Sequence, residues 1–128
     1  MSRSLRALWL SVCGASLLLL GGCGEEGPPT GATCPTDNTL TAANFGTDFM
    51  NRYCNRCHAS GVSGLARAGA PTDVNFDTLE GVRREAANID RWSGASDTVT
   101  NTSMPPGGTS PSVEERRKLS QWLACGAP

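Results

Sequence analysis

The chain has 128 residues, of which 5% are aromatic and 18% charged, and its formal net charge at pH 7 is −1. This length allows one domain, and the scattered basic residues argue against a nucleic-acid-binding surface. With 15 glycines, 8 prolines and few aromatic side chains, the core is expected to be thin, and a small domain of this kind usually needs a disulfide or a cofactor.

Residues 1–22 are expected to be a signal peptide. A basic start precedes an apolar run at 7–20, which is too short for a membrane-spanning helix. The run ends in Leu-Gly-Gly-Cys, which resembles a bacterial lipobox, so we expect Cys23 to be lipidated and to become the mature N-terminus. The alternative is an ordinary signal peptide cut near Gly22, which would leave Cys23 as a spare thiol.

Removal of the signal peptide would make the chain more acidic. Arg3 and Arg6 are two of the 11 basic residues, so nine bases would remain against 12 acids, a net charge of −3. Export would place the protein on the periplasmic side of a bacterial membrane, where disulfides form. Gly24 is not an inner-membrane retention residue, which favours the outer membrane.

Residues 23–33 are expected to form a flexible tether between a lipid anchor and a domain at 34–128. Gly, Pro, Thr and Glu dominate this segment, and it has no apolar face to bury. Such a spacer would hold the domain away from the membrane surface.

A first helix is expected from about Thr41 to a pair of cysteines that follows it. Phe45, Phe49 and Tyr53 recur at i, i+4 and i+8, which places them along one stripe of a helix. Met50 widens this stripe and is therefore interpreted as a core residue.

The sequence Cys54-Asn55-Arg56-Cys57-His58 follows this helix. Two cysteines three residues apart on a helical turn direct both thiols to the same side. Thioether bonds to the two vinyl groups of a haem require this arrangement, and the adjacent His58 can reach the iron. Cys-x-x-Cys-His is a signature of covalent haem attachment.

Other uses of this motif fit the chain less well. A thioredoxin-like dithiol would require a preceding strand and a βαβ context, which the sequence does not predict. A zinc site would need further ligands, yet His58 is the only histidine and no second Cys-x-x-Cys exists. A disulfide between Cys54 and Cys57 would leave His58 unexplained.

The segment at 59–72 is rich in Gly, Ala and Ser and is expected to be a long loop. A second helix is expected to begin at Asp77, which has the spacing of a capping box with Glu80, and to end at Gly94. Its apolar face would be formed by Leu79, Val82, Ala86 and Ile89.

Residues 95–111 contain three prolines and are expected to form another loop. A last helix would begin with a capping box of Ser112 and Glu115 and end at Gly126. Its apolar side would be formed by Leu119, Trp122 and Leu123. No segment alternates with a period of two, so no substantial sheet is expected.

The sixth ligand of a haem iron must come from another part of the chain, and the absence of a second histidine excludes a bis-histidine site within one chain. The candidates are Met50, Met104, a lysine or an open position. We expect Met104, because it lies in an irregular loop before two prolines and its soft thioether suits haem iron. The alternative is that Met104 is a small apolar plug.

Two further cysteines flank the expected helices. Cys34 precedes the first helix and Cys125 ends the last one. In an exported protein such a leftover pair is expected to form a disulfide. The alternative is two free thiols.

Over residues 41–125 the chain resembles the class I cytochrome c family. The resemblance rests on the helix that ends in the Cys54–His58 motif, the Met104 loop and the C-terminal helix with Trp122. The family has a glycine at the position of Gly46, which lets the first helix cross closely against an aromatic residue of the last, here Trp122. In the family a proline carbonyl accepts the axial histidine Nδ1–H, and Ala70-Pro71 is the candidate for this role. The Cys34–Cys125 pair departs from the general pattern.

The expected fold is therefore all-α, with three main helices and long loops wrapped around one covalently attached haem c. The resemblance implies one-electron transfer by a carrier rather than an enzyme, with His58 and Met104 as iron ligands. Its partners would be other redox proteins, met through transient contacts, and a membrane through the anchor at Cys23. The alternatives are a haem enzyme or a gas or redox sensor with a labile sixth ligand, and a structural lipoprotein.

Overall fold

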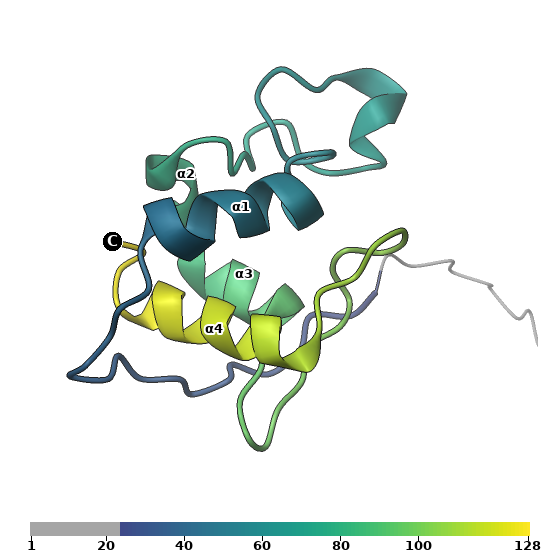
Figure 1. Cartoon of the computed structure of the whole chain (residues 1–128). Coiled ribbons are helices and arrows are strands. Elements are labelled where there is room, and N and C mark those ends of the chain that lie inside the picture. The colour runs from purple at the N-terminus through teal and green to yellow at the C-terminus, as the bar shows by residue number, and fades with distance from the viewer. Residues whose placement is uncertain (1–23) are drawn as a thin grey trace, which may run out of the picture.

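The computed structural model describes residues 24–128, so the expected signal peptide and Cys23 lie outside the described residues. The described chain folds into helices joined by long loops (Figure 1). Within these residues there is no strand, only an isolated antiparallel bridge between Ala95 and Thr100. The all-α expectation is confirmed. No helix in this part of the chain combines the length and the apolar character needed to cross a membrane.

The first helix is one continuous run in three parts. Ala42–Gly46 and Met50–Cys54 are π-helical, and α1, Thr47–Phe49, lies between them. Thr41 caps the run, because its hydroxyl accepts from the Asn44 amide while the Asn44 side chain accepts from the Thr41 amide. The helix thus begins at the expected residue.

The aromatic stripe of this helix packs into the core as expected. The ring centroids of Phe45 and Phe49 lie 5.5 Å apart, and those of Phe49 and Tyr53 lie 4.9 Å apart. Phe49, Met50 and Tyr53 are all buried, which confirms Met50 as a core residue. The rings of these two pairs are tilted by 40° and 60° to each other, and aromatic contacts at such spacings add to the free energy of apolar burial.

The second predicted helix is two helices, α2 at Leu79–Arg84 and α3 at Ala86–Ser93, separated at Glu85. The predicted capping box at Asp77 is wrong. Thr78 caps α2 by accepting from the Gly81 amide, because the Asp77 carboxylate is already bound by the amide and hydroxyl of Ser60. The apolar face is as expected, with Val82 and Ile89 buried.

The last helix, α4 at Val113–Ala124, confirms its predicted start. Ser112 and Glu115 form the reciprocal capping box. Leu119 and Trp122 are 0% exposed, so the apolar side of α4 forms the centre of the core. The helix ends at Ala124, with Cys125 as its C-cap just before Gly126.

Gly46 and Trp122 mark where the first helical run crosses α4. A Cβ added to Gly46 would lie 2.1 Å from Cζ2 of Trp122, a separation that real atoms do not adopt. Phe45 packs edge-on against the same indole, with ring centroids 6.1 Å apart. The close crossing that the family resemblance implies is therefore present.

The N-terminal segment 24–33 is not the free tether that its composition predicts. It runs along the domain (Figure 1), and Thr30 is buried. The Asp90 carboxylate accepts from both the amide and the hydroxyl of Thr30, at 2.9 and 2.7 Å. Asn101 also donates to the Pro28 carbonyl. These contacts fix a segment that has no apolar face of its own.

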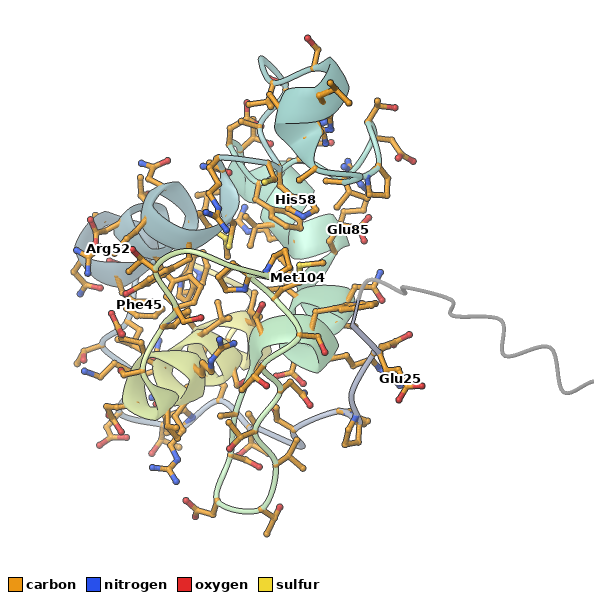
Figure 2. All side chains as sticks on the ribbon, turned by 90° about the vertical axis from the view of Figure 1, so that its right-hand side faces the viewer. Glu25, Phe45, Arg52, His58, Glu85 and Met104 are labelled. Atoms are coloured by element: carbon orange, nitrogen blue, oxygen red, sulfur yellow. A yellow bond between two sulfur atoms is a disulfide. The ribbon has the colours of Figure 1, made fainter. Side chains whose placement is uncertain are left out.

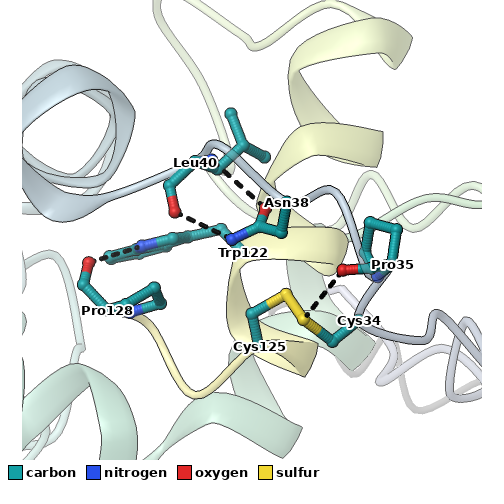
Figure 3. Close-up of a disulfide and its surroundings, with 7 residues drawn as sticks. All are labelled: Cys34, Pro35, Asn38, Leu40, Trp122, Cys125 and Pro128. Atoms are coloured by element: carbon teal, nitrogen blue, oxygen red, sulfur yellow. Dashed lines mark hydrogen bonds between the residues drawn. A yellow bond between two sulfur atoms is a disulfide. The ribbon is translucent and has the colours of Figure 1, made fainter.

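A disulfide joins Cys34 to Cys125 and ties this arm to the end of α4 (Figure 3). The C-terminus is fixed nearby, since the indole N–H of Trp122 donates to the carbonyl of Pro128 at 3.3 Å. The disulfide spans 91 residues. Both ends of the domain are thus held against the core.

We expect the double variant Cys34→Ser and Cys125→Ser to lose about 4–5 kcal/mol of stability, because a cross-link over a loop of this length strongly restricts the unfolded chain. Urea unfolding of the variant and of the wild type, followed by circular dichroism, measures this difference. Equal unfolding midpoints and slopes would show that the disulfide contributes nothing to stability.

Candidate functional site

A cavity of about 430 Å³ lies between the Cys54–His58 segment, α3, the loop at 67–76 and the loop around Met104. Most of its surface is apolar, and its size falls within the range of about 300–1,000 Å³ typical of cofactor and small-molecule sites. All four residues expected to hold a haem line it, namely Cys54, Cys57, His58 and Met104. Figure 2 shows His58 and Met104 on one side of the molecule, contributed by two separate segments.

The two motif cysteines lie where the first helical run ends. The amides of Cys57 and His58 both donate to the Cys54 carbonyl, at 3.1 and 2.9 Å, so the motif forms one further turn. Both cysteines are free thiols. Burial raises the pKa of the Cys54 thiol to about 12, although nearby Arg116 lowers it, so this thiol is neutral at pH 7. Both cysteines line the same cavity.

The imidazole of His58 is oriented by its Nδ1 atom, which lies 3.1 Å from the carbonyl of Val74. Because a carbonyl only accepts, Nδ1 carries the proton and Nε2 keeps its lone pair. Burial lowers the pKa of His58, the Val74 carbonyl raises it, and the charge of Arg67 lowers it. The net lowering keeps the ring neutral at pH 7, as metal ligation requires.

The prediction that the Pro71 carbonyl accepts the Nδ1–H of His58 is wrong. That carbonyl accepts from the guanidinium of Arg67 and from the amide of Val74, which closes a turn. The turn carries the chain forward and brings the Val74 carbonyl to His58 instead. Phe76 follows and stacks on the imidazole, with centroids 4.8 Å apart and an interplanar angle of 24°.

Met104 lies within the loop between α3 and α4, and its main chain is hydrogen-bonded on both sides. Its amide donates to the Trp92 carbonyl at 3.0 Å, and its own carbonyl accepts from Arg116 at 2.9 Å. The peptide bond to Pro105 is cis. Met50, the other methionine considered, is 2% exposed and is not among the residues that line the cavity.

Arg67 was not expected to be a site residue, yet it is 3% exposed and lines the cavity. Its guanidinium donates to the carbonyls of Ala59, Val62, Ala70, Pro71 and Val74 and to the side chain of Asn75. These bonds give the loop at 59–75 its shape. They also polarise the Val74 carbonyl that orients His58. The sequence did hold a signal for this role, because Arg67 is the only charged residue in the stretch 59–72, which is rich in Gly, Ala and Ser.

Arg116 is a second buried arginine, on α4, and is 2% exposed. Burial lowers its pKa, whereas the neighbouring Cys54 and Glu115 raise it. Its position three residues before Leu119 places it on the apolar face of the helix, which was the signal available in the sequence.

The residues around the cavity fit a c-type haem. Such a haem takes two thiols for its covalent bonds, a neutral imidazole and a soft sixth ligand, and these four groups share one mainly apolar cavity. Between residues 24 and 128, no three His, Cys, Asp or Glu side chains cluster in a way that would hold a metal ion by themselves.

Comparisons with known proteins found no relative of this chain. No protein-family model, no curated protein and no solved structure matches the chain.

Proposed function

We propose that the chain is a single-haem c-type cytochrome, similar to the class I family, that transfers one electron at a time. The observation that carries this proposal is the convergence of Cys54, Cys57, His58 and Met104 on one cavity. The cysteines would hold the haem covalently, and His58 and Met104 would be its axial ligands. When bound, the haem iron supplies a centre that gains and loses one electron.

The chain's own residues support a carrier rather than a catalyst. His58 is held neutral, with Nδ1 on the Val74 carbonyl, so little rearrangement would be needed for ligation. The thioether of Met104 would raise the reduction potential and would leave no open position for a substrate.

The absorption spectrum tests this proposal directly. The chain is expressed with a cytochrome maturation system and purified, and its absorption spectrum is recorded in the oxidised and the reduced state. We expect a sharp, low-spin reduced spectrum and a weak methionine–iron band in the oxidised form. Ready binding of carbon monoxide to the reduced wild type would instead favour a haem enzyme or gas sensor. A chain without any haem absorption would overturn the proposal.

Met104→Ala is expected to open the sixth position, because no other side chain that lines the cavity offers a thioether. The methionine–iron band should disappear, and the reduced protein should then bind carbon monoxide. Met50→Leu is the matched control, since it changes a core methionine outside the cavity and should leave the band in place. Survival of the band in Met104→Ala would show that Met104 is not the ligand.

The setting of the protein is part of the proposal. A lipid anchor at Cys23 would hold the domain on the periplasmic side of a bacterial membrane, where redox proteins would meet it through transient contacts. The arm that follows packs next to the site, since Glu26 lines the cavity and the Glu25 carbonyl accepts from Ser103 at 2.6 Å. The anchor would therefore hold the cavity close to the membrane surface.

A further inference from the structure

The guanidinium of Arg116 binds both ends of the loop that leads to Met104. Its Nη1 donates to the carbonyl of Ser93 at 2.9 Å, to that of Asn101 at 2.8 Å and to that of Met104 at 2.9 Å. Ser93 is the last residue of α3, so one guanidinium binds the main chain where the segment from α3 to Met104 begins and where it ends. This rigid, planar group thus holds the two ends of the segment close together.

This cation has no carboxylate partner among residues 24–128, because every ion pair of this part of the chain involves other side chains. Burial of a guanidinium is costly unless its donors are used. The guanidinium instead donates to main-chain carbonyls, and such charge-assisted hydrogen bonds are stronger than those between neutral groups.

The main chain of Met104 is restrained on both sides. Its carbonyl also accepts from the Ser93 hydroxyl, at 3.3 Å, and its amide donates to the Trp92 carbonyl at 3.0 Å. Arg116 itself is not among the residues that line the cavity. Its hydrogen bonds therefore act on the sixth-ligand candidate through the main chain of Met104.

We propose that Arg116 is a positioning residue for Met104: its bonds to the loop hold the thioether in the cavity and so keep the sixth position closed to external ligands. This inference rests on the proposed function, since it concerns a ligand of the haem iron. Loss of these bonds would free the loop, and an external ligand would then compete with Met104 more successfully.

The test compares Arg116→Gln with Arg117→Gln in the haem-loaded protein. Arg117 is exposed, lies one residue further along α4 and reaches the loop only through a loose ion pair with the exposed Asp97 at 3.7 Å. Its variant removes the same charge while the hydrogen bonds of Arg116 to the loop stay in place. The affinity of the oxidised protein for imidazole and the methionine–iron band are measured for both.

Arg116→Gln should bind imidazole at least about tenfold more tightly, the factor expected for loss of hydrogen bonds to a charged group, and its methionine–iron band should weaken. Arg117→Gln should match the wild type. A band and an imidazole affinity equal to those of Arg117→Gln would overturn the role of Arg116.

Ser93→Ala provides a milder test of the same restraint if Arg116→Gln does not fold. It removes only the hydroxyl that donates to the Met104 carbonyl, and it should raise imidazole affinity about twofold to threefold, as for loss of a weak neutral hydrogen bond. An unchanged affinity would then overturn the inference.

The two proposals fail in different ways. A wild-type chain that takes up no haem refutes the proposed function before any variant is compared. A wild type with a methionine–iron band, beside an Arg116→Gln protein with the same band and affinity, refutes only the positioning role.

Discussion

Replacement of both Cys54 and Cys57 by alanine is expected to abolish covalent haem attachment. Each thioether bond would consume one of these thiols, and the other two cysteines among residues 24–128 are joined in the Cys34–Cys125 disulfide. After expression with a cytochrome maturation system, the denatured wild type should retain haem on an electrophoresis gel stained for haem, and the variant should retain none.

The matched control removes the other pair of cysteines. The double variant Cys34→Ser and Cys125→Ser should keep its covalent haem while losing stability, because neither cysteine of this disulfide is among the residues that line the cavity. Haem that stays bound to the denatured Cys54→Ala and Cys57→Ala protein would contradict the assignment. Loss of haem from both double variants would show that attachment depends on the fold as a whole.

Gly46→Ala is expected to destabilise the domain by about 3 kcal/mol, the upper end of the cost of overpacking a core. The added Cβ would lie 2.1 Å from Cζ2 of Trp122, and this indole is fully buried and cannot move away. The first helical run would have to move off α4. Urea unfolding followed by circular dichroism measures the loss.

Gly61→Ala is the matched control for this change. A Cβ at Gly61 would meet no atom within 4 Å, so its stability should stay within about 0.5 kcal/mol of the wild type, as for ordinary surface changes. The cost of Gly46→Ala should also shrink in a Trp122→Phe background, because the clash involves atoms of the indole that Phe lacks. A Gly46→Ala protein as stable as Gly61→Ala would contradict the close crossing.

Local sequence signals predicted most of the helices. The capping box at Ser112 is confirmed because both of its partners lie within four residues of each other. The similar spacing of Asp77 and Glu80 predicted a capping box that is absent, since the Asp77 carboxylate is bound by Ser60, 17 residues away. A side chain that has both a local and a distant partner cannot be assigned from spacing alone.

Composition was a poor guide to the N-terminal arm. Its Gly, Pro and Glu content is typical of a mobile segment, but its order comes from polar partners elsewhere in the fold. Thr30 is held by Asp90, and Pro28 by Asn101. Such contacts depend on how α3 and the following loop are placed, which the sequence of the arm does not contain.

The candidate site shows the same division between local and distant information. The positions of Cys54, Cys57 and His58 follow from five consecutive residues, and a short motif of this kind can be recognised directly. The acceptor for His58 depends on the turn that follows Pro71, where Arg67 and the Val74 amide occupy the expected carbonyl. Arginine is seldom fully buried, so neither Arg67 nor Arg116 was expected inside the domain.

The intact mass of the purified chain shows directly whether haem is attached to it covalently. The protein is expressed with a cytochrome maturation system, fully denatured and analysed by mass spectrometry. We expect a mass increase of one haem on the wild type, located by proteolysis on the peptide that contains Cys54 and Cys57. A wild-type chain with both thiols unmodified would contradict the proposal that this protein is a c-type cytochrome.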